Sequence, residues 1–60
     1  MVKYDLGNKI YIERFNREFL IVYCVGFYHL IDLCSYLSFK YFLNLEDMSE
    51  WLKEYNAIVR

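Results

Sequence analysis

Residues 9–25, KIYIERFNREFLIVYCV, hold two runs of strand-forming residues with a break between them. β-Branched and aromatic residues dominate both runs, which is typical of strands. Asn16 and Arg17 interrupt the apolar pattern, and asparagine tolerates the left-handed conformation that tight hairpin turns need. The stretch therefore predicts an antiparallel hairpin. Its second strand is apolar on both faces, so we expect it at the centre of a sheet or at an interface.

Residues 27–42, FYHLIDLCSYLSFKYF, fit two structures. Strand alternation after a bend at Gly26 places His29, Ile31 and Leu33 on one face and Tyr28, Leu30 and Asp32 on the other, with SFKYF as a fourth strand. Helical spacing of Phe27, Leu30, Cys34, Leu37 and Tyr41 fits almost as well. Periodicity alone does not decide between the two for short apolar runs. The density of aromatic and β-branched residues favours strands.

Residues 44–59, NLEDMSEWLKEYNAIV, predict an amphipathic helix. Asn44 is a good N-cap. An apolar stripe recurs at helical spacing and consists of Leu45, Met48, Leu52, Tyr55 and Val59, widened by Trp51 and Ile58. The acidic residues Glu46, Asp47, Glu50 and Glu54 fall on the opposite face, where we expect them to be solvated.

The predicted fold is α+β, a small antiparallel β-meander of three to four strands followed by one C-terminal amphipathic helix packed on the sheet. We expect residues 1–60 to form a single compact domain. A chain of 60 residues buries only about 60% of the surface that it exposes when unfolded, so such small domains often rely on disulfides, a metal or oligomerisation.

Disulfides and metals are disfavoured by the residues present. The chain has two cysteines, Cys24 and Cys34, and one histidine, His29, without the paired spacing of a zinc site. The N-terminal MVKYDLGNK lacks the apolar stretch of a secretory signal, so we expect a reducing, cytoplasmic compartment with both cysteines buried as apolar residues.

Catalysis is disfavoured as well. His29, Asp32 and Cys34 are the one group of reactive side chains, and a nucleophilic site needs such residues to meet in a cleft from distant segments. Here they lie close together in the chain, with little length around them to form a cleft. We therefore predict no enzyme activity and no catalytic, cofactor or metal site.

Oligomerisation is favoured by the aromatic content, which is seven tyrosines, five phenylalanines and one tryptophan. Protein interfaces are enriched in large rings, which combine contact area with a polar tip. We expect a homodimer, with Trp51 at the margin of the helix stripe and in need of a second surface. The predicted interface residues are Phe19, Ile21, Val22, Tyr23, Tyr28, Trp51 and Tyr55.

The resulting functional hypothesis is a small, non-enzymatic protein-interaction module. Rigid aromatic side chains are typical of binding hot spots, and no small-molecule substrate is indicated. The composition is also typical of AT-rich coding sequence. We therefore expect a phage or mobile-element inhibitor that binds and blocks a host enzyme or defence complex.

Two alternatives stay open. A dimeric nucleic-acid-binding regulator would use Arg14 and Arg17, although the net charge of −1 lacks the basic balance that phosphate binding needs. A single-span membrane protein would use residues 19–39, which are long enough to cross a bilayer. His29 and Asp32 near the centre of that segment oppose insertion, because an acidic residue there costs about 3 kcal/mol.

Overall fold

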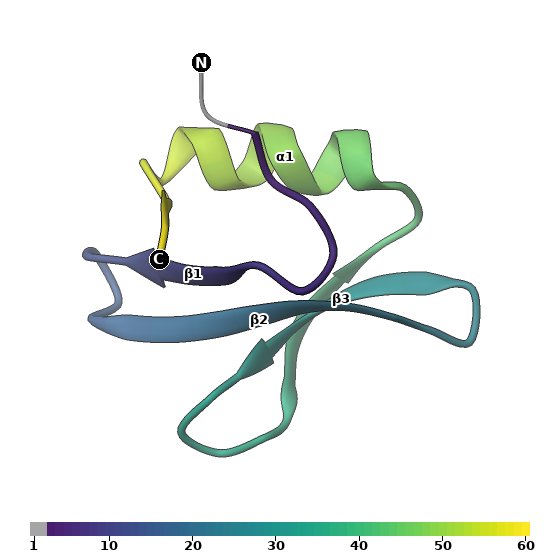
Figure 1. Ribbon diagram of the computed structural model, residues 1–60, viewed down its shortest axis with the longest axis horizontal. Helices are drawn as coiled ribbons and strands as arrows, with labels where there is room; N and C mark the ends of the chain where they lie inside the picture. The colour runs from purple at the N-terminus through teal and green to yellow at the C-terminus, as the bar shows by residue number, and fades with distance from the viewer. Residues whose placement is uncertain (1–2) are drawn as a thin grey trace.

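The computed structural model describes residues 3–60, which form one antiparallel five-stranded sheet and one helix (Figure 1). In chain order the elements are β1 (Lys9–Ile12), β2 (Arg17–Cys24), β3 (Phe27–Asp32), β4 (Ser38–Phe42), α1 (Leu45–Glu54) and β5 (Ile58–Val59). The strand order across the sheet is β4-β3-β2-β1-β5. This meander with a C-terminal helix packed on it confirms the predicted α+β fold.

The two hairpins follow from their turn residues. Between β1 and β2 the chain reverses through Asn16, which has the expected left-handed backbone with a φ of 52°. Between β2 and β3, Cys24 pairs with Phe27 and only Val25 and Gly26 form the connection. Their φ angles of 50° and 82° give a turn of the kind whose twist matches the flanking strands. Residues 27–42 thus form β3 and β4 with a loop at 33–37 between them, and the helical alternative is wrong.

Helix α1 begins as predicted and ends earlier than predicted. The side chain of Asn44 accepts a hydrogen bond of 2.8 Å from the backbone N–H of Asp47, which makes it the N-cap. The helix stops after Glu54, because Asn56 adopts a left-handed conformation with a φ of 53°. The N–H of Ala57 then bonds to the carbonyl of Leu52 at 3.0 Å, a standard left-handed helix end.

Ile58 and Val59 therefore do not continue the apolar stripe of the helix, and the predicted range of 44–59 is too long. They form β5, in which Val59 pairs with Ile10 and Ile58 with Tyr11.

The core lies between the sheet and α1. The fully buried side chains are Ile10, Ile12, Phe19, Ile21 and Leu30 from the sheet and Met48 and Leu52 from the helix. The segment from Lys3 to β1 crosses α1 in the view of Figure 1. There the hydroxyl of Tyr4 donates a buried hydrogen bond of 2.7 Å to the carbonyl of Ala57. Strand β2 lies at the centre of the sheet, as its apolar composition predicts.

Candidate protein-binding surface

One face of the sheet packs on α1, and the opposite face carries a second set of large side chains. Successive side chains of a strand point to opposite faces, and residues directly opposite in neighbouring strands share a face. Leu20 pairs with Ile31, and Val22 pairs with His29, which in turn pairs with Tyr41. These residues alternate with the buried Phe19, Ile21 and Leu30. We call the side chains opposite α1 the open face: Lys9, Tyr11, Glu18, Leu20, Val22, Phe27, His29, Ile31 and Tyr41.

The centre of the open face is apolar and partly exposed. Leu20, Val22 and Ile31 are half-buried, and their neighbours in the sheet supply that burial. Toward β4 the surface becomes aromatic, because the rings of Phe27 and Tyr41 meet edge to face with centroids 5.2 Å apart. Tyr41 is 61% exposed. The open face is therefore a contiguous apolar surface across the central strands.

The ring of His29 is held in one orientation on the open face. Its Nε2 lies 3.3 Å from the carbonyl oxygen of Cys24, and its Nδ1 lies 3.0 Å from the hydroxyl of Ser38. A carbonyl can only accept a hydrogen bond, so the neutral ring carries its proton on Nε2 and accepts at Nδ1 from Ser38. The ring of Tyr41 lies beside it, with centroids 5.9 Å apart. His29 thus presents a fixed ring surface.

Charged side chains gather at the β1 end of this face. Arg60 lies with its guanidinium carbon 4.1 Å from the centroid of the Tyr11 ring, and one of its nitrogens is 3.5 Å from a carboxylate oxygen of Glu18. Together with Arg17 and Cys34 these residues line a shallow recess. By contrast, the two central rows of paired side chains contain no acidic residue, lysine or arginine. One row is Leu20 and Ile31, and the other is Val22, His29 and Tyr41.

The structure divides the predicted interface residues among different surfaces. Phe19 and Ile21 are fully buried beneath α1, which is incompatible with their expected contact with a partner. Tyr28 packs against the core on the same side, and its ring meets that of the exposed Tyr23 at 4.9 Å. Val22 is the one predicted residue that lies on the open face.

Trp51 and Tyr55 belong to an aromatic cluster within the chain. The ring centroid of Trp51 lies 4.5 Å from that of Tyr55 and 5.9 Å from that of Phe42, and the ammonium of Lys40 lies 5.8 Å from it. A register shift in the pairing of β3 with β4 lets Phe39 also reach the helix side, 6.3 Å from Trp51. Strand β4 therefore supplies a second surface for Trp51 within the chain, so a partner is not required for it.

Sequence reasoning missed most of the open face. The alternation in residues 27–33 does place His29 and Ile31 on the same face, as predicted. The pairing of β3 with β2 adds Leu20, and the pairing with β4 adds Tyr41. The apolar residues on both faces of β2 indicated that a second apolar surface exists. Only the pairing register of the strands shows which residues of β2, β3 and β4 form it.

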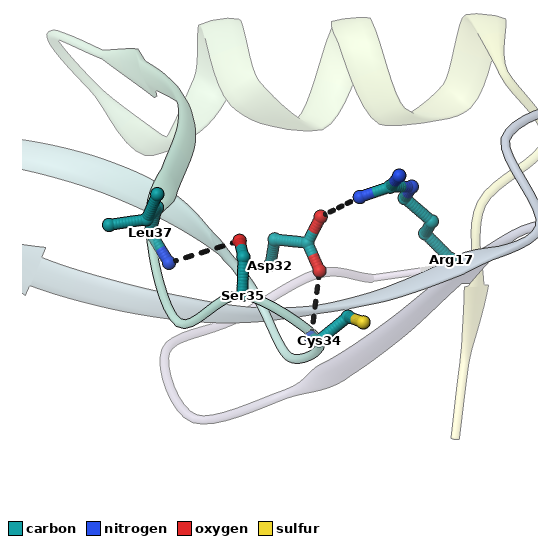
Figure 2. A network of polar contacts seen from close by, with 5 residues as sticks. All are labelled: Arg17, Asp32, Cys34, Ser35 and Leu37. Atoms are coloured by element: carbon teal, nitrogen blue, oxygen red, sulfur yellow. Dashed lines mark hydrogen bonds and ion pairs between the residues drawn. The ribbon is translucent and has the colours of Figure 1, made fainter.

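The structure does not bring His29, Asp32 and Cys34 together as a reactive group. Asp32 is buried on the helix side of the sheet, whereas His29 is on the open face. One carboxylate oxygen of Asp32 accepts a hydrogen bond of 2.8 Å from the backbone N–H of Cys34, and the other pairs with Arg17 (Figure 2). The Cys34 N–H and then the Arg17 guanidinium hold the pKa of Asp32 below its usual value. These contacts stabilise the loop between β3 and β4, residues 33–37.

Other predicted features also have definite positions. Cys24 and Cys34 are free and exposed, so the prediction of buried cysteines is wrong. Arg17 is paired with Asp32, and the guanidinium carbon of Arg14 lies 5.5 Å from the centroid of the Tyr55 ring. The acidic side chains of α1 are solvent-exposed as expected: Glu46, Asp47, Glu50 and Glu54.

Residues 3–60 hold neither a metal-ligand cluster nor a helix that could span a membrane. Within that range no cluster of three or more histidine, cysteine, aspartate or glutamate residues could hold a metal ion. The helix found there is too short and too polar to cross a membrane. Comparisons with protein-family models, with curated proteins and with solved structures find no match.

Proposed function

We propose that this protein is a non-enzymatic interaction module that forms a two-fold homodimer through its open face and binds a further protein as a dimer. The observation that carries the proposal is the apolar centre formed by Leu20, Val22 and Ile31 on the face opposite α1. Burial of such a surface is favourable by roughly 25 cal/mol per Å². Contiguous apolar surface is a common feature of interaction sites, which supports the proposal.

A second copy of the chain is a suitable occupant because of the charge distribution. A two-fold contact brings the same patch together twice, so a patch with a net charge at its centre would repel itself. Leu20, Val22 and Ile31 at the centre of the open face are apolar, and the charged Lys9, Glu18 and Arg60 lie on its β1 side. The face is therefore electrostatically compatible with its own copy.

The size of the molecule also supports this arrangement. A stable interface buries about 800 Å² on each partner. The accessible surface of the whole chain is 4304 Å², so a dimer would use roughly a fifth of it. A 60-residue chain with a single buried core gains stability from such an association.

Light scattering coupled to size-exclusion chromatography tests the dimer. We expect a mass of about twice the 7.4 kDa of one chain at micromolar concentration. A mass of one chain that does not change with concentration would exclude the dimer.

For the further partner, our hypothesis remains a host enzyme or defence complex that this protein inhibits. It rests on the surface chemistry and on the AT-rich composition. Affinity capture with identification by mass spectrometry, followed by an activity assay of the captured protein, tests it. Undiminished activity of that protein at saturating inhibitor would contradict the inhibitor hypothesis.

A further inference from the structure

His29 lies beside the apolar centre of the open face. It is directly opposite Val22 in the pairing of β2 with β3, and the next side chain of β3 on the same face is Ile31. The ring is half-buried within one copy of the chain. A contact that covers Val22 and Ile31 would therefore cover His29 as well. His29 is the single histidine of the sequence, and histidine is the residue whose charge ordinarily changes between pH 5 and pH 8.

The hydrogen bonds of His29 hold its ring in place in both protonation states. In the neutral ring, Nε2 donates to the carbonyl oxygen of Cys24 at 3.3 Å, and Nδ1 accepts from the hydroxyl of Ser38 at 3.0 Å. When Nδ1 takes up a proton from solvent it becomes a donor, and the Ser38 oxygen can accept because a hydroxyl group does both. Both bonds therefore survive protonation, and the ring gains its charge without leaving the open face.

Within residues 3–60, no group beside His29 compensates that charge. Strand β2 supplies Val22 and Cys24 next to the ring, and β4 supplies Ser38 and Tyr41. The titratable side chains among these four are a thiol and a phenol, which are ordinarily uncharged below pH 7.5. Neither ion pair found in the described part of the chain includes His29.

The charged side chains of the neighbouring strands lie away from His29. Lys40 of β4 is on the other face of the sheet, where its ammonium lies 5.8 Å from the centroid of the Trp51 ring. Lys9 and Glu18 are on the open face but on its β1 side. A two-fold axis through the apolar centre brings central residues of one copy onto central residues of the other, and rim residues onto rim residues. Glu18 of a second copy therefore stays at the rim, away from His29.

We propose that His29 makes the open-face dimer sensitive to pH, so that neutral His29 allows the dimer and protonated His29 dissociates it into folded monomers. The inference rests on the proposed dimer and names how that contact is regulated. Protonation places one uncompensated positive charge from each copy near the centre of an apolar contact. Burying such a charge is strongly unfavourable, whereas water solvates it in the monomer.

The direction of the pH dependence follows from which state binds the proton. The monomer exposes the ring and accepts a proton, whereas the dimer excludes it, so association releases protons and is favoured as the pH rises. Association is therefore lost as the pH falls through the range in which histidine titrates. For two rings with the ordinary histidine pKa of about 6.5, we expect the dissociation constant to rise on the order of 100-fold between pH 7.5 and pH 5.5.

Sedimentation velocity over a concentration series at pH 7.5, 6.5 and 5.5 tests the proposal on the wild type and on His29→Gln. Glutamine can donate and accept hydrogen bonds but does not titrate, so we expect its dissociation constant to stay within about threefold over this range. His29→Phe, which keeps a ring beside Tyr41, is measured in parallel and should be equally insensitive to pH. Circular dichroism at each pH establishes that all three proteins are folded.

Three results would overturn the inference. These are a wild-type dissociation constant that does not rise in acid, a rise of equal size in the two variants, and loss of the folded circular dichroism spectrum together with the dimer. The measurement at pH 7.5 tests the proposed function separately. A wild-type dimer that persists at pH 5.5 removes only the role of His29, whereas a monomer at pH 7.5 removes the dimer and this inference with it.

Discussion

Val22 lies directly opposite His29 in the pairing of β2 with β3, and both side chains are on the open face. Val22→Glu would place a carboxylate at the centre of the proposed dimer contact. Burying an unpaired charge costs several kcal/mol, so we expect the dimer dissociation constant to rise on the order of 100-fold. Sedimentation velocity over a concentration series measures this change.

The control for Val22→Glu is Leu43→Glu, which adds the same charge at an exposed position outside the open face. We expect this control to sediment like the wild type, and circular dichroism should show that both variants are folded. Equal dissociation constants for the two variants would place the dimer contact elsewhere.

Val25 occupies a turn position that disfavours it. Its φ is 50° and its side chain is 87% exposed, so the residue contributes little packing while its branched side chain strains the backbone. We expect Val25→Asn to raise the free energy of unfolding by about 1 kcal/mol, because asparagine tolerates this conformation. Urea unfolding monitored by tryptophan fluorescence measures the change. A variant that is less stable than the wild type would show that Val25 makes contacts that this account omits.

The lowered pKa of Asp32 makes folding sensitive to acid. The Cys34 N–H and Arg17 favour the ionised carboxylate in the folded protein, so its contribution to stability is present above the ordinary aspartate pKa of about 4. That contribution is lost as the pH falls from this value through the lower pKa of the folded state. Asp32→Asn keeps a hydrogen-bond acceptor but cannot ionise.

We therefore expect the melting temperature of the wild type to fall more steeply between pH 5 and pH 2 than that of Asp32→Asn. Differential scanning calorimetry across this range, with the exposed Asp47→Asn as control, measures the difference. Parallel curves for the wild type and Asp32→Asn would contradict the role assigned to this carboxylate.

Tyr4 connects the N-terminal segment to the end of α1 through its hydrogen bond to the Ala57 carbonyl. Burial raises the pKa of this tyrosine, so the hydroxyl remains a donor at neutral pH. Tyr4→Phe keeps the ring but leaves the carbonyl without this donor, and we expect a loss of about 1–2 kcal/mol in the free energy of unfolding. Chemical denaturation measures it, with the exposed Tyr23→Phe as the matched change. A loss of equal size in both variants would contradict a specific role for this bond.

The strands were predictable because their composition and alternation point to the same structure. In residues 9–25 the turn at Asn16 and the β-branched residues agree with the hairpin. The end of α1 was not predicted, because Ile58 and Val59 continue the helical spacing of apolar residues. The left-handed Asn56 outweighs that spacing, and it directs both residues into β5.

The candidate surface was predictable only in part. The two apolar faces of β2 indicate that one face meets the helix and the other a partner or solvent. The residues expected at the interface were chosen by size and chemistry, and this choice mixed the faces: Phe19 and Ile21 are core residues. The local sequence also could not show the register shift between β3 and β4. This shift brings Phe39 toward Trp51, so the Trp51 ring packs against β4 of its own chain.

The most direct test of the dimer through the open face is an isotope-filtered nuclear Overhauser experiment on a mixture of labelled and unlabelled chains. It detects contacts between copies only, and it identifies the side chains that make them. We predict intermolecular signals from the methyl groups of Leu20, Val22 and Ile31 to the same group of residues or to His29 and Tyr41. Intermolecular signals confined to the helix or to Leu43, or none at concentrations where both copies are folded, would contradict the account.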